Sequence, residues 1–165
     1  MNSRERYLLA LNHEEADDRI PRTDSPWGHT VNRWHKEGLP EGESPASYFG
    51  YDEIAGFGAD CSFQLPHETI EDTDKYTIYK DANGAIRKNF KDHESTPECI
   101  DFTIKDRKTW EEYKPKLAWN DSRVNWENGL KGNKAARERG AFVTYNGVFG
   151  YDRVQGIVGS QRLLE

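Results

Sequence analysis

Apolar residues recur at helical spacing along several segments of the chain, and most of these segments carry start or stop signals. Asn2 and Glu5 have the spacing of a capping box ahead of such a stripe. Asp106 can cap another helix, which Pro115 should kink or end near Lys114, and Gly38 is a helix stop. Together these patterns predict helices over residues 2–13, 27–38, 45–50, 106–114, 121–139 and 151–164.

Other segments alternate apolar and polar residues or are rich in β-branched and aromatic residues, as strands are. Asn83-Gly84 lies between two of them and predicts a β-hairpin. The predicted strands are residues 19–24, 61–65, 76–80, 85–90, 99–104 and 141–145. Helices separate the strands near Ile20, Phe63 and Phe142, so these three are expected to pair in parallel in one sheet.

Composition and charge narrow the classes of protein. The 165 residues suit one domain, and five Trp, eight Tyr and seven Phe supply apolar surface for a folded chain. The net charge of −6 disfavours sequence-independent binding to the negatively charged phosphates of nucleic acid, so no nucleic-acid partner is expected.

Targeting and redox signals are absent from the sequence pattern. No basic start with an apolar stretch resembles a signal peptide, and no apolar run approaches 18 residues, so a cytoplasmic protein without a membrane partner is expected. Cys61 and Cys99 stand apart without a CxxC partner and are expected to be reduced, buried thiols.

Several segments of the sequence resemble those of one known protein family. The most specific is the opening SRERYLLALNHEEADDRIP at 3–21, and further segments are RWHKEGLP at 33–40, YFGYD at 48–52, Asn83-Gly84 in a paired extended region, and WEEYK at 110–114. Together they resemble the uroporphyrinogen decarboxylase superfamily. The resemblance covers essentially the whole chain but only the first half of the family's usual length. It implies an α/β fold, the N-terminal part of a (β/α)₈ TIM barrel with an inserted β-hairpin. The last predicted helix has no stop signal, so residues 1–165 are expected to be a barrel portion truncated at its C-terminus.

The superfamily contains two chemistries. Uroporphyrinogen decarboxylases remove acetate carboxyls from a tetrapyrrole without a cofactor, and related methyltransferases move a methyl group between a methylated substrate and a corrinoid protein or a thiol, commonly with zinc. Decarboxylases carry an arginine-rich carboxylate clamp after the first strand, whereas this chain has SPWGHT at 25–30. The decarboxylase aspartate after the second strand aligns with Leu65-Pro66-His67. The departures favour the methyltransferase branch.

The resemblance assigns no cofactor to this segment. The family's zinc ligands are a His-x-Cys pair and a later Cys in the second half of the chain, and neither Cys61 nor Cys99 matches them. Metal ligands in these residues are therefore not expected, while the resemblance allows zinc and a corrinoid in a full-length parent.

The expected site residues follow the carboxyl ends of the predicted strands, because barrel enzymes place their sites there. Asp24, His29 and His67 are the catalytic candidates. Asp24 has the alternative role of a helix cap, and His29 that of a surface imidazole.

Trp27, Tyr145 and Asn146 are the substrate-binding candidates. Trp27 could equally pack within a helical stripe. Tyr145-Asn146 could equally form a strand-to-helix turn, because Asn tolerates left-handed backbone.

The sequence therefore predicts a methyltransferase-type family member that acts on a small methylated molecule, with a corrinoid protein as a possible partner. A true uroporphyrinogen decarboxylase is the alternative within the family. A non-catalytic binding module or an inactive fragment is the alternative of another class, because a half barrel leaves strand edges open and could oligomerise through them.

Overall fold

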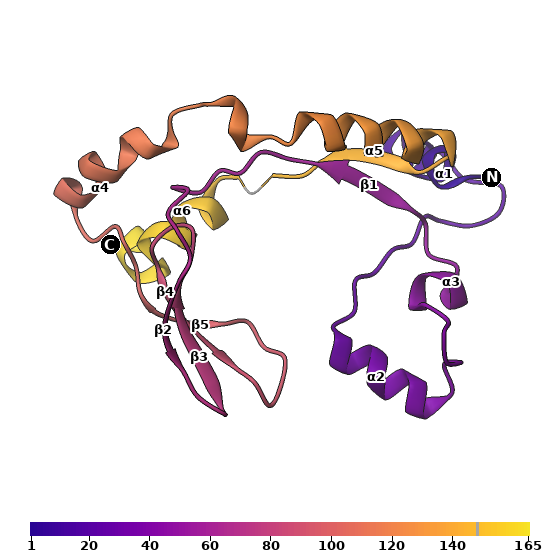
Figure 1. Cartoon of the computed structure of the whole chain (residues 1–165). Coiled ribbons are helices and arrows are strands. Elements are labelled where there is room, and N and C mark those ends of the chain that lie inside the picture. Colours follow the sequence, from indigo (N-terminus) through magenta and orange to yellow (C-terminus); the bar gives the residue numbers. More distant parts are fainter. Residues whose placement is uncertain (148) are drawn as a thin grey trace. The chain divides into compact units, whose positions relative to one another are not determined.

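The computed structural model describes residues 1–147 and 149–165 and has a mixed α/β fold (Figure 1). The chain forms two compact units. Unit 1 comprises Met1–Gly58 with Val124–Asn146, and unit 2 comprises Ala59–Arg123 with Gly147–Glu165. Unit 1 contains a two-stranded parallel sheet and unit 2 a four-stranded antiparallel sheet, and the described strands form no closed barrel.

Local capping signals set the helices of unit 1. The side chain of Asn2 accepts a hydrogen bond from the Glu5 backbone and Glu5 returns one, which confirms the predicted capping box. Gly38 ends the second helix, as predicted, at a φ of 123°. The helices are α1 (Ser3–Leu11), α2 (Gly28–Glu37), α3 (Pro45–Phe49) and α5 (Trp126–Glu138).

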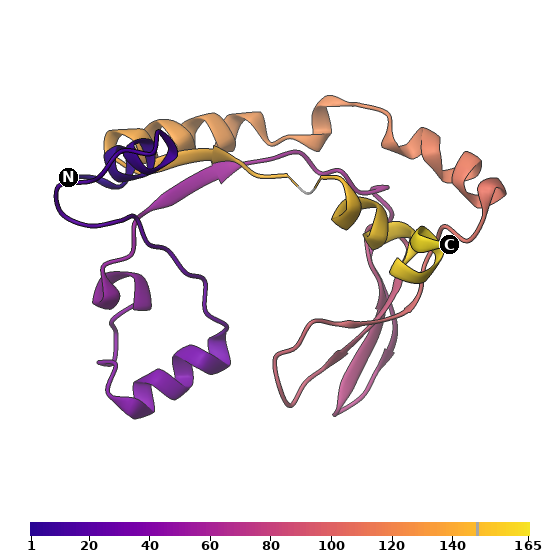
Figure 2. The ribbon, with the colours of Figure 1, turned by 180° about the vertical axis from the view of Figure 1, so that it is seen from behind.

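The parallel pair of unit 1 joins β1 (Ile54–Phe57) to β6 (Phe142–Tyr145) in the register Ile54↔Phe142 to Phe57↔Tyr145. Figures 1 and 2 show α5 running along this pair. Gly129 of α5 allows the close contact, because a Cβ there would lie 2.7 Å from the Phe57 ring. Tyr7 of α1 stacks on Phe142 with ring centroids 4.8 Å apart. Helices α5 and α1 therefore both pack against the β1–β6 strand pair.

The prediction that strands near Ile20, Phe63 and Phe142 pair in parallel in one sheet is wrong, because only the segment at Phe142 forms a strand. Residues 19–24 form no strand, because Pro21 has no N–H for a ladder and the neighbouring Arg19 and Arg22 bind the Asp52 carboxylate. Ile20 is 81% exposed. The partner of β6 is instead β1, which the alternation pattern did not reveal.

Residues 61–65 also form no strand, although their side chains alternate. Ser62 donates its backbone N–H to Asp60, and the Ser62 hydroxyl accepts from the Gln64 N–H. Gln64 has a positive φ of 53°. These local turns replace ladder hydrogen bonds, as short polar side chains often do.

The antiparallel sheet of unit 2 confirms the predicted hairpin. Its strands are β2 (Glu68–Asp72), β3 (Tyr76–Lys80), β4 (Ile86–Phe90) and β5 (Glu98–Asp101), in the order β2-β3-β4-β5. The β3–β4 turn closes by a hydrogen bond from the Gly84 N–H to the Asp81 carbonyl (2.8 Å). The hairpin is thus the centre of a four-stranded sheet.

Helices of unit 2 pack on a small apolar core. Phe63, Ile104 and Ile157 are buried, and partly buried side chains from the neighbouring helices surround them. The helix that begins at Arg107 ends at Tyr113, and Pro115 lies in the short 3₁₀ helix that follows, so the predicted end of this helix before Pro115 is confirmed. The elements are α4 (Arg107–Tyr113), η1 (Lys114–Leu117), η2 (Asp121–Arg123), α6 (Tyr151–Val158) and α7 (Ser160–Leu164).

Two predicted helices differ from the structure at glycine or polar positions. The segment from Asp121 first forms the short η2, and α5 begins only at Trp126, capped by Asn125. The predicted helix 151–164 is interrupted at Gly159, which has a φ of 90° and lies against the Phe102 ring. Within 1–147 and 149–165, no helix is both long and apolar enough to cross a membrane.

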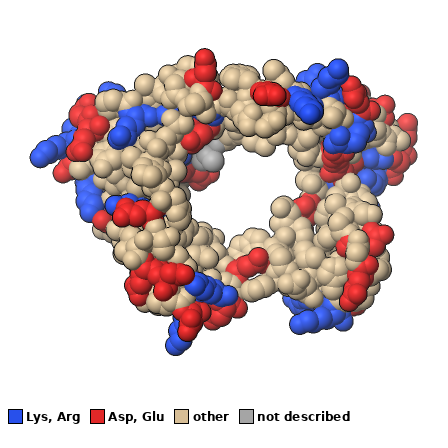
Figure 3. Space-filling view, viewed as in Figure 1, with Lys and Arg blue, Asp and Glu red and all other residues tan. Residues whose placement is uncertain are grey.

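Charged side chains of both signs are interspersed on the surface. On the face shown in Figure 3, neither Lys and Arg nor Asp and Glu cover a broad area alone. Several of them form ion pairs within one element, such as Arg33 with Glu37 and Arg107 with Glu111. Exposed pairs of this kind contribute little stability.

Replacing Gly84 by Ala is expected to destabilise the β3–β4 hairpin by about 1–2 kcal/mol, the usual cost of a left-handed backbone for a residue with a Cβ. Gly84 has a φ of 73°, and its Cβ would lie 2.7 Å from the Thr103 hydroxyl oxygen and 2.9 Å from a Leu65 methyl. Hydrogen exchange of β3 and β4 peptides measures the loss. Gly156→Ala is the matched control in unit 2, because nothing lies within 4 Å of its Cβ position. Equal protection in both variants would contradict the prediction.

Candidate ligand-binding sites

The carboxyl end of the β1–β6 pair brings the predicted Tyr145 and Asn146 next to each other. Tyr145 is the last residue of β6 and is 69% exposed. The Asn146 N–H donates to the Phe57 carbonyl (3.2 Å), and its side-chain oxygen accepts from the Thr144 hydroxyl (3.1 Å). A Cβ on Gly58 would collide with the Asn146 carbonyl oxygen, so the two strand ends meet backbone to backbone. The phenol and the amide thus stand at a fixed strand end.

Asp24, Trp27 and His29 lie in the extended segment before α2 and in its first turn. Asp24 accepts from the Ser25 N–H (2.8 Å), and the N-cap position of α2 belongs to Trp27, so the alternative of Asp24 as this helix's cap is wrong. Trp27 is 54% exposed, which disfavours a packing role, and His29 is exposed. Both ribbon views show α2 away from the β1–β6 pair (Figures 1 and 2). The structure does not bring Trp27 and Tyr145 together as walls of one pocket.

His67 precedes β2 in unit 2 and is exposed. Its ring stacks on Tyr79 of β3, with centroids 4.9 Å apart and an angle of 22° between the planes. The stacking gives this imidazole a fixed orientation, and its catalytic role stays a prediction.

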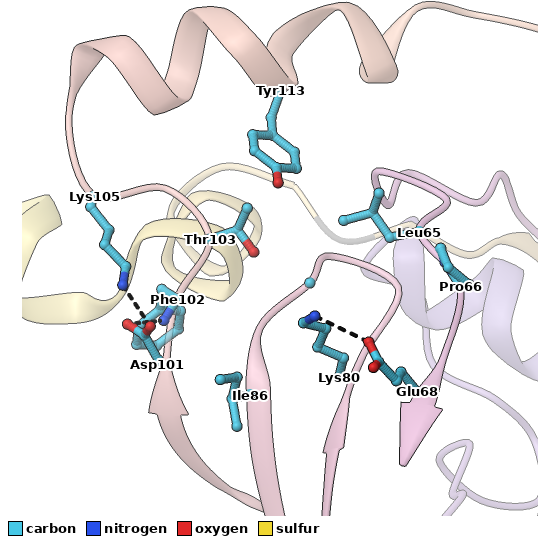
Figure 4. Close-up of a pocket in the computed structure, with 11 residues that line it drawn as sticks. Leu65, Pro66, Glu68, Lys80, Ile86, Asp101, Phe102, Thr103, Lys105 and Tyr113 are labelled. Atoms are coloured by element: carbon cyan, nitrogen blue, oxygen red, sulfur yellow. Dashed lines mark hydrogen bonds and ion pairs between the residues drawn. The ribbon is translucent and has the colours of Figure 1, made fainter. Parts of the chain in front are cut away.

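A cavity of about 360 Å³ lies in unit 2 beside His67, and we call it the sheet cavity (Figure 4). Its walls come from the start of β2, the turn ends of β3 and β4, the end of β5 and α4. Apolar groups and two lysines line it together: Leu65, Pro66, Lys80, Ile86, Phe102 and Lys105. In Figure 4 the Tyr113 hydroxyl points into the cavity from α4. This size falls within the usual range of small-molecule pockets, about 300–1,000 Å³.

Two ion pairs set the charge of the sheet cavity. The Lys80 ammonium contacts the Glu68 carboxylate at 3.1 Å, and the Lys105 ammonium contacts Asp101 at 2.6 Å. The hydrogen bond from Lys105 lowers the pKa of Asp101 below its usual range, although partial burial opposes this shift. With both lysines paired, the cavity offers a phenol hydroxyl and apolar walls. It suits a small polar molecule better than a multiply charged anion.

The two thiols differ in exposure. Cys61 is exposed, so its predicted burial is wrong, and Cys99 is half-buried in β5. Burial raises the pKa of the Cys99 thiol. Cys61 leaves the core because residues 61–65 form turns and do not form the predicted strand.

The described residues contain no group of three His, Cys, Asp or Glu side chains that could hold a metal ion.

Sequence reasoning missed the residues of the sheet cavity. Lys80 ends β3, Lys105 lies in the loop between β5 and α4, and Tyr113 ends α4, so the three converge only through the fold. A strand-end rule for parallel sheets does not point to them, because this sheet is antiparallel. The predicted hairpin around Asn83-Gly84, the predicted strand 99–104 and the predicted helix 106–114 indicated elements of its walls but not their convergence.

Comparisons with protein-family models, with curated proteins and with solved structures found no match to this chain. The resemblance to the uroporphyrinogen decarboxylase superfamily thus depends on the quoted segments alone.

Proposed function

We propose that the chain is the N-terminal part of a uroporphyrinogen decarboxylase-like (β/α)₈ barrel of the methyltransferase type. The observation that carries the proposal is the in-register parallel pair of β1 and β6, with Tyr145 and Asn146 at its carboxyl end. Barrel enzymes hold their sites at this end of parallel strands. In this proposal β1 and β6 are neighbouring barrel strands, and the antiparallel sheet is an insertion between them.

Methyl transfer requires a pocket that holds a methylated small molecule and a proton source for the departing heteroatom. The bond between the methyl carbon and the donor heteroatom breaks, and its electron pair stays on the heteroatom, which takes a proton. The acceptor, a corrinoid or a thiolate, supplies the electron pair of the new bond. We assign Tyr145 and Asn146 to substrate binding. Trp27 for substrate binding, and Asp24, His29 and His67 for proton transfer, stay separate candidates from the sequence and are not assigned to the same site.

Lost carboxylate clamps argue against uroporphyrinogen as the substrate. Residues 25–30 contain no arginine where decarboxylases carry several. Each missing charge-assisted contact removes about 1.5–3 kcal/mol. Two such losses weaken binding by roughly 10²–10⁴-fold at about 1.4 kcal/mol per tenfold. A methylated small molecule needs no such clamp.

The protein that carries these residues is expected to form a methylated corrinoid or thiol from a methoxy or methylamine donor and to leave uroporphyrinogen unchanged. Absorption spectroscopy follows the corrinoid, and chromatography follows coproporphyrinogen. Tyr145→Ala is expected to lower kcat/KM by up to about 100-fold, the scale of a misplaced substrate. Tyr48→Ala is the matched control, because Tyr48 is also exposed but lies on α3.

Different outcomes separate the alternatives. Efficient conversion of uroporphyrinogen would identify a decarboxylase. Absence of methyl transfer with every donor, together with unchanged ligand binding in Tyr145→Ala, Trp27→Ala and His29→Ala, would identify a binding module and refute the proposal.

A further inference from the structure

The floor of the sheet cavity is one row of side chains across the antiparallel sheet. In the strand register Glu68 of β2 lies opposite Lys80 of β3. Lys80 in turn lies opposite Ile86 of β4, and Ile86 lies opposite Asp101 of β5. Directly opposite residues of antiparallel strands point to the same face, and all four line the cavity. The row therefore places a negative, a positive, an apolar and a negative side chain side by side.

The charged groups of this row are accessible and keep unused hydrogen-bonding capacity. The Lys80 ammonium has three donors, of which one goes to Glu68, and the Lys80 side chain is 46% exposed. The Asp101 carboxylate accepts from the Phe102 N–H and the Lys105 ammonium, and its side chain is 37% exposed. A carboxylate has about four acceptor positions, so some remain free. A ligand can therefore bond to Lys80 and Asp101 without breaking either ion pair.

The sheet cavity carries no net charge but separates its charges. Its charged lining residues are two carboxylates and two lysines, joined as the ion pairs Lys80–Glu68 and Lys105–Asp101. In Figure 4 these two pairs lie on opposite sides of Ile86. A ligand with a net charge would leave that charge unbalanced in the cavity. A zwitterion, which has one charge of each sign, suits both ends.

The spacing of the row selects the length of such a zwitterion. Lys80 and Asp101 lie on either side of β4, so their backbones are two strand spacings apart, roughly 10 Å at about 4.8 Å per spacing. The Lys80 ammonium leans toward Glu68 of β2, away from β4, which widens the gap between the two charges. An α-amino acid has both charged groups on one carbon and is too short to bridge this gap. An ω-amino acid has them at opposite ends of a methylene chain.

Between its charges the cavity offers apolar surface and one neutral polar group. Ile86 lies between the two charged ends, and Leu65 and Phe102 add to the apolar walls. The Tyr113 hydroxyl points into the cavity (Figure 4), and it has no hydrogen-bond partner among the described residues. The Tyr113 ring packs against the core residue Phe63, with centroids 5.5 Å apart, so this hydroxyl is held in place.

We propose that the sheet cavity binds a short ω-amino acid, with its carboxylate on the Lys80 ammonium, its methylene groups over Ile86 and its ammonium on the Asp101 carboxylate. Both end contacts are charge-assisted hydrogen bonds. The Tyr113 hydroxyl supplies a further donor that faces the cavity. The site lies in unit 2 and is independent of the proposed methyl transfer at Tyr145, which lies in unit 1.

Titration of the ¹⁵N-labelled full chain with 4-aminobutanoate, followed by NMR, tests the proposal. Saturable amide shifts are expected at the cavity residues Gly84, Ile86 and Phe102. The matched ligand is 2-aminobutanoate, an isomer with both charged groups on one carbon. Butanoate and butylamine each keep only one of the charges. We expect each of these three compounds to bind at least about 5-fold more weakly, as the loss of one half-exposed charge contact implies.

Two substitutions test the two ends of the ligand separately. Lys80→Gln is expected to weaken binding of 4-aminobutanoate and butanoate by at least about 5-fold and to leave butylamine unaffected. Asp101→Asn is expected to weaken 4-aminobutanoate and butylamine and to leave butanoate unaffected. A merely structural role would weaken all three compounds alike. Lys91→Gln is the matched control, because Lys91 forms a similar exposed ion pair with Asp72 and does not line the cavity.

The same titrations can overturn the proposal. Absence of saturable shifts, shifts outside the cavity residues, or equal affinity for 4-aminobutanoate and 2-aminobutanoate would do so. Unchanged affinity for 4-aminobutanoate in a folded Lys80→Gln or Asp101→Asn variant would do so as well. If a variant fails to fold, the comparison of the four compounds on the unaltered chain decides.

Discussion

Replacing Asp52 by Asn is expected to cost unit 1 about 3–5 kcal/mol of its free energy of unfolding, the usual cost of breaking a buried ion pair from one side. The Asp52 side chain is fully buried and accepts from Arg6 (2.7 Å), Arg19 (2.6 Å) and the Arg22 N–H (2.9 Å). The substitution leaves two guanidinium groups without their shared carboxylate. Hydrogen exchange of peptides from α1 and residues 50–57 measures the loss, with peptides from β2–β5 as the internal reference.

Asp17→Asn is the matched control, because Asp17 is an exposed residue of the preceding loop. A surface substitution of this kind changes stability by about 0.5 kcal/mol or less. Equal exchange in the two variants would show that the buried carboxylate contributes nothing beyond an exposed one.

The same carboxylate makes the stability of unit 1 depend on pH. Burial raises the pKa of Asp52, but the hydrogen bonds from Arg19, the Arg22 N–H and Arg6 lower it further, to about 2. Because the folded-state pKa lies below the unfolded value of about 3.9, the contribution is present above about pH 4 and is lost as the pH falls toward 2. Protection of α1 should fall over this range, and the fall should be smaller in Asp52→Asn.

Elements set by neighbouring residues could be predicted from the sequence. The capping box of Asn2 and Glu5, the hairpin turn at Asn83-Gly84 and the helix end before Pro115 each depend on contacts within about five residues. Such signals are readable because backbone conformation and a local hydrogen bond agree there. The α/β class followed from the mixture of these elements.

Strand pairing could not be predicted, because distant contacts decide it. The extended residues 19–24 were expected to join a sheet, but Asp52, about thirty residues away, binds Arg19 and the Arg22 backbone. The strand β1 was missed because Ile-Ala-Gly-Phe is short and contains a glycine, which usually weakens a strand signal. Its glycine is required, since a Cβ on Gly56 would collide with the Thr144 carbonyl oxygen of β6.

The candidate sites also differ in whether their residues could be predicted from the sequence. Tyr145 and Asn146 could be named from the sequence because they directly follow a strand. The sheet cavity could not be predicted, since Lys80, Lys105 and Tyr113 converge only through the fold. The bonding of Arg123 could not be predicted either, since its acceptors Asp60 and Ser62 lie about sixty positions away. Buried cations bound only to carbonyls, as Arg123 is, leave no charge partner in the sequence that would mark them.

Replacing Arg123 by Met is expected to destabilise unit 2 by at least about 3 kcal/mol, because four backbone carbonyls lose a charged donor and each unsatisfied buried group costs about 1–3 kcal/mol. Arg123→Lys keeps the charge but presents a compact ammonium, which cannot reach the carbonyls of both segments, 60–62 and 116–118, so about half of this loss is expected. Hydrogen exchange of peptides covering 59–65 and 114–123 measures it.

Arg107→Met is the matched control for this prediction, because the Arg107 side chain is 82% exposed and its removal breaks one surface ion pair. Its effect should stay within about 0.5 kcal/mol. Equal exchange of these peptides in Arg107→Met and Arg123→Met would show that the buried guanidinium contributes nothing beyond an exposed one.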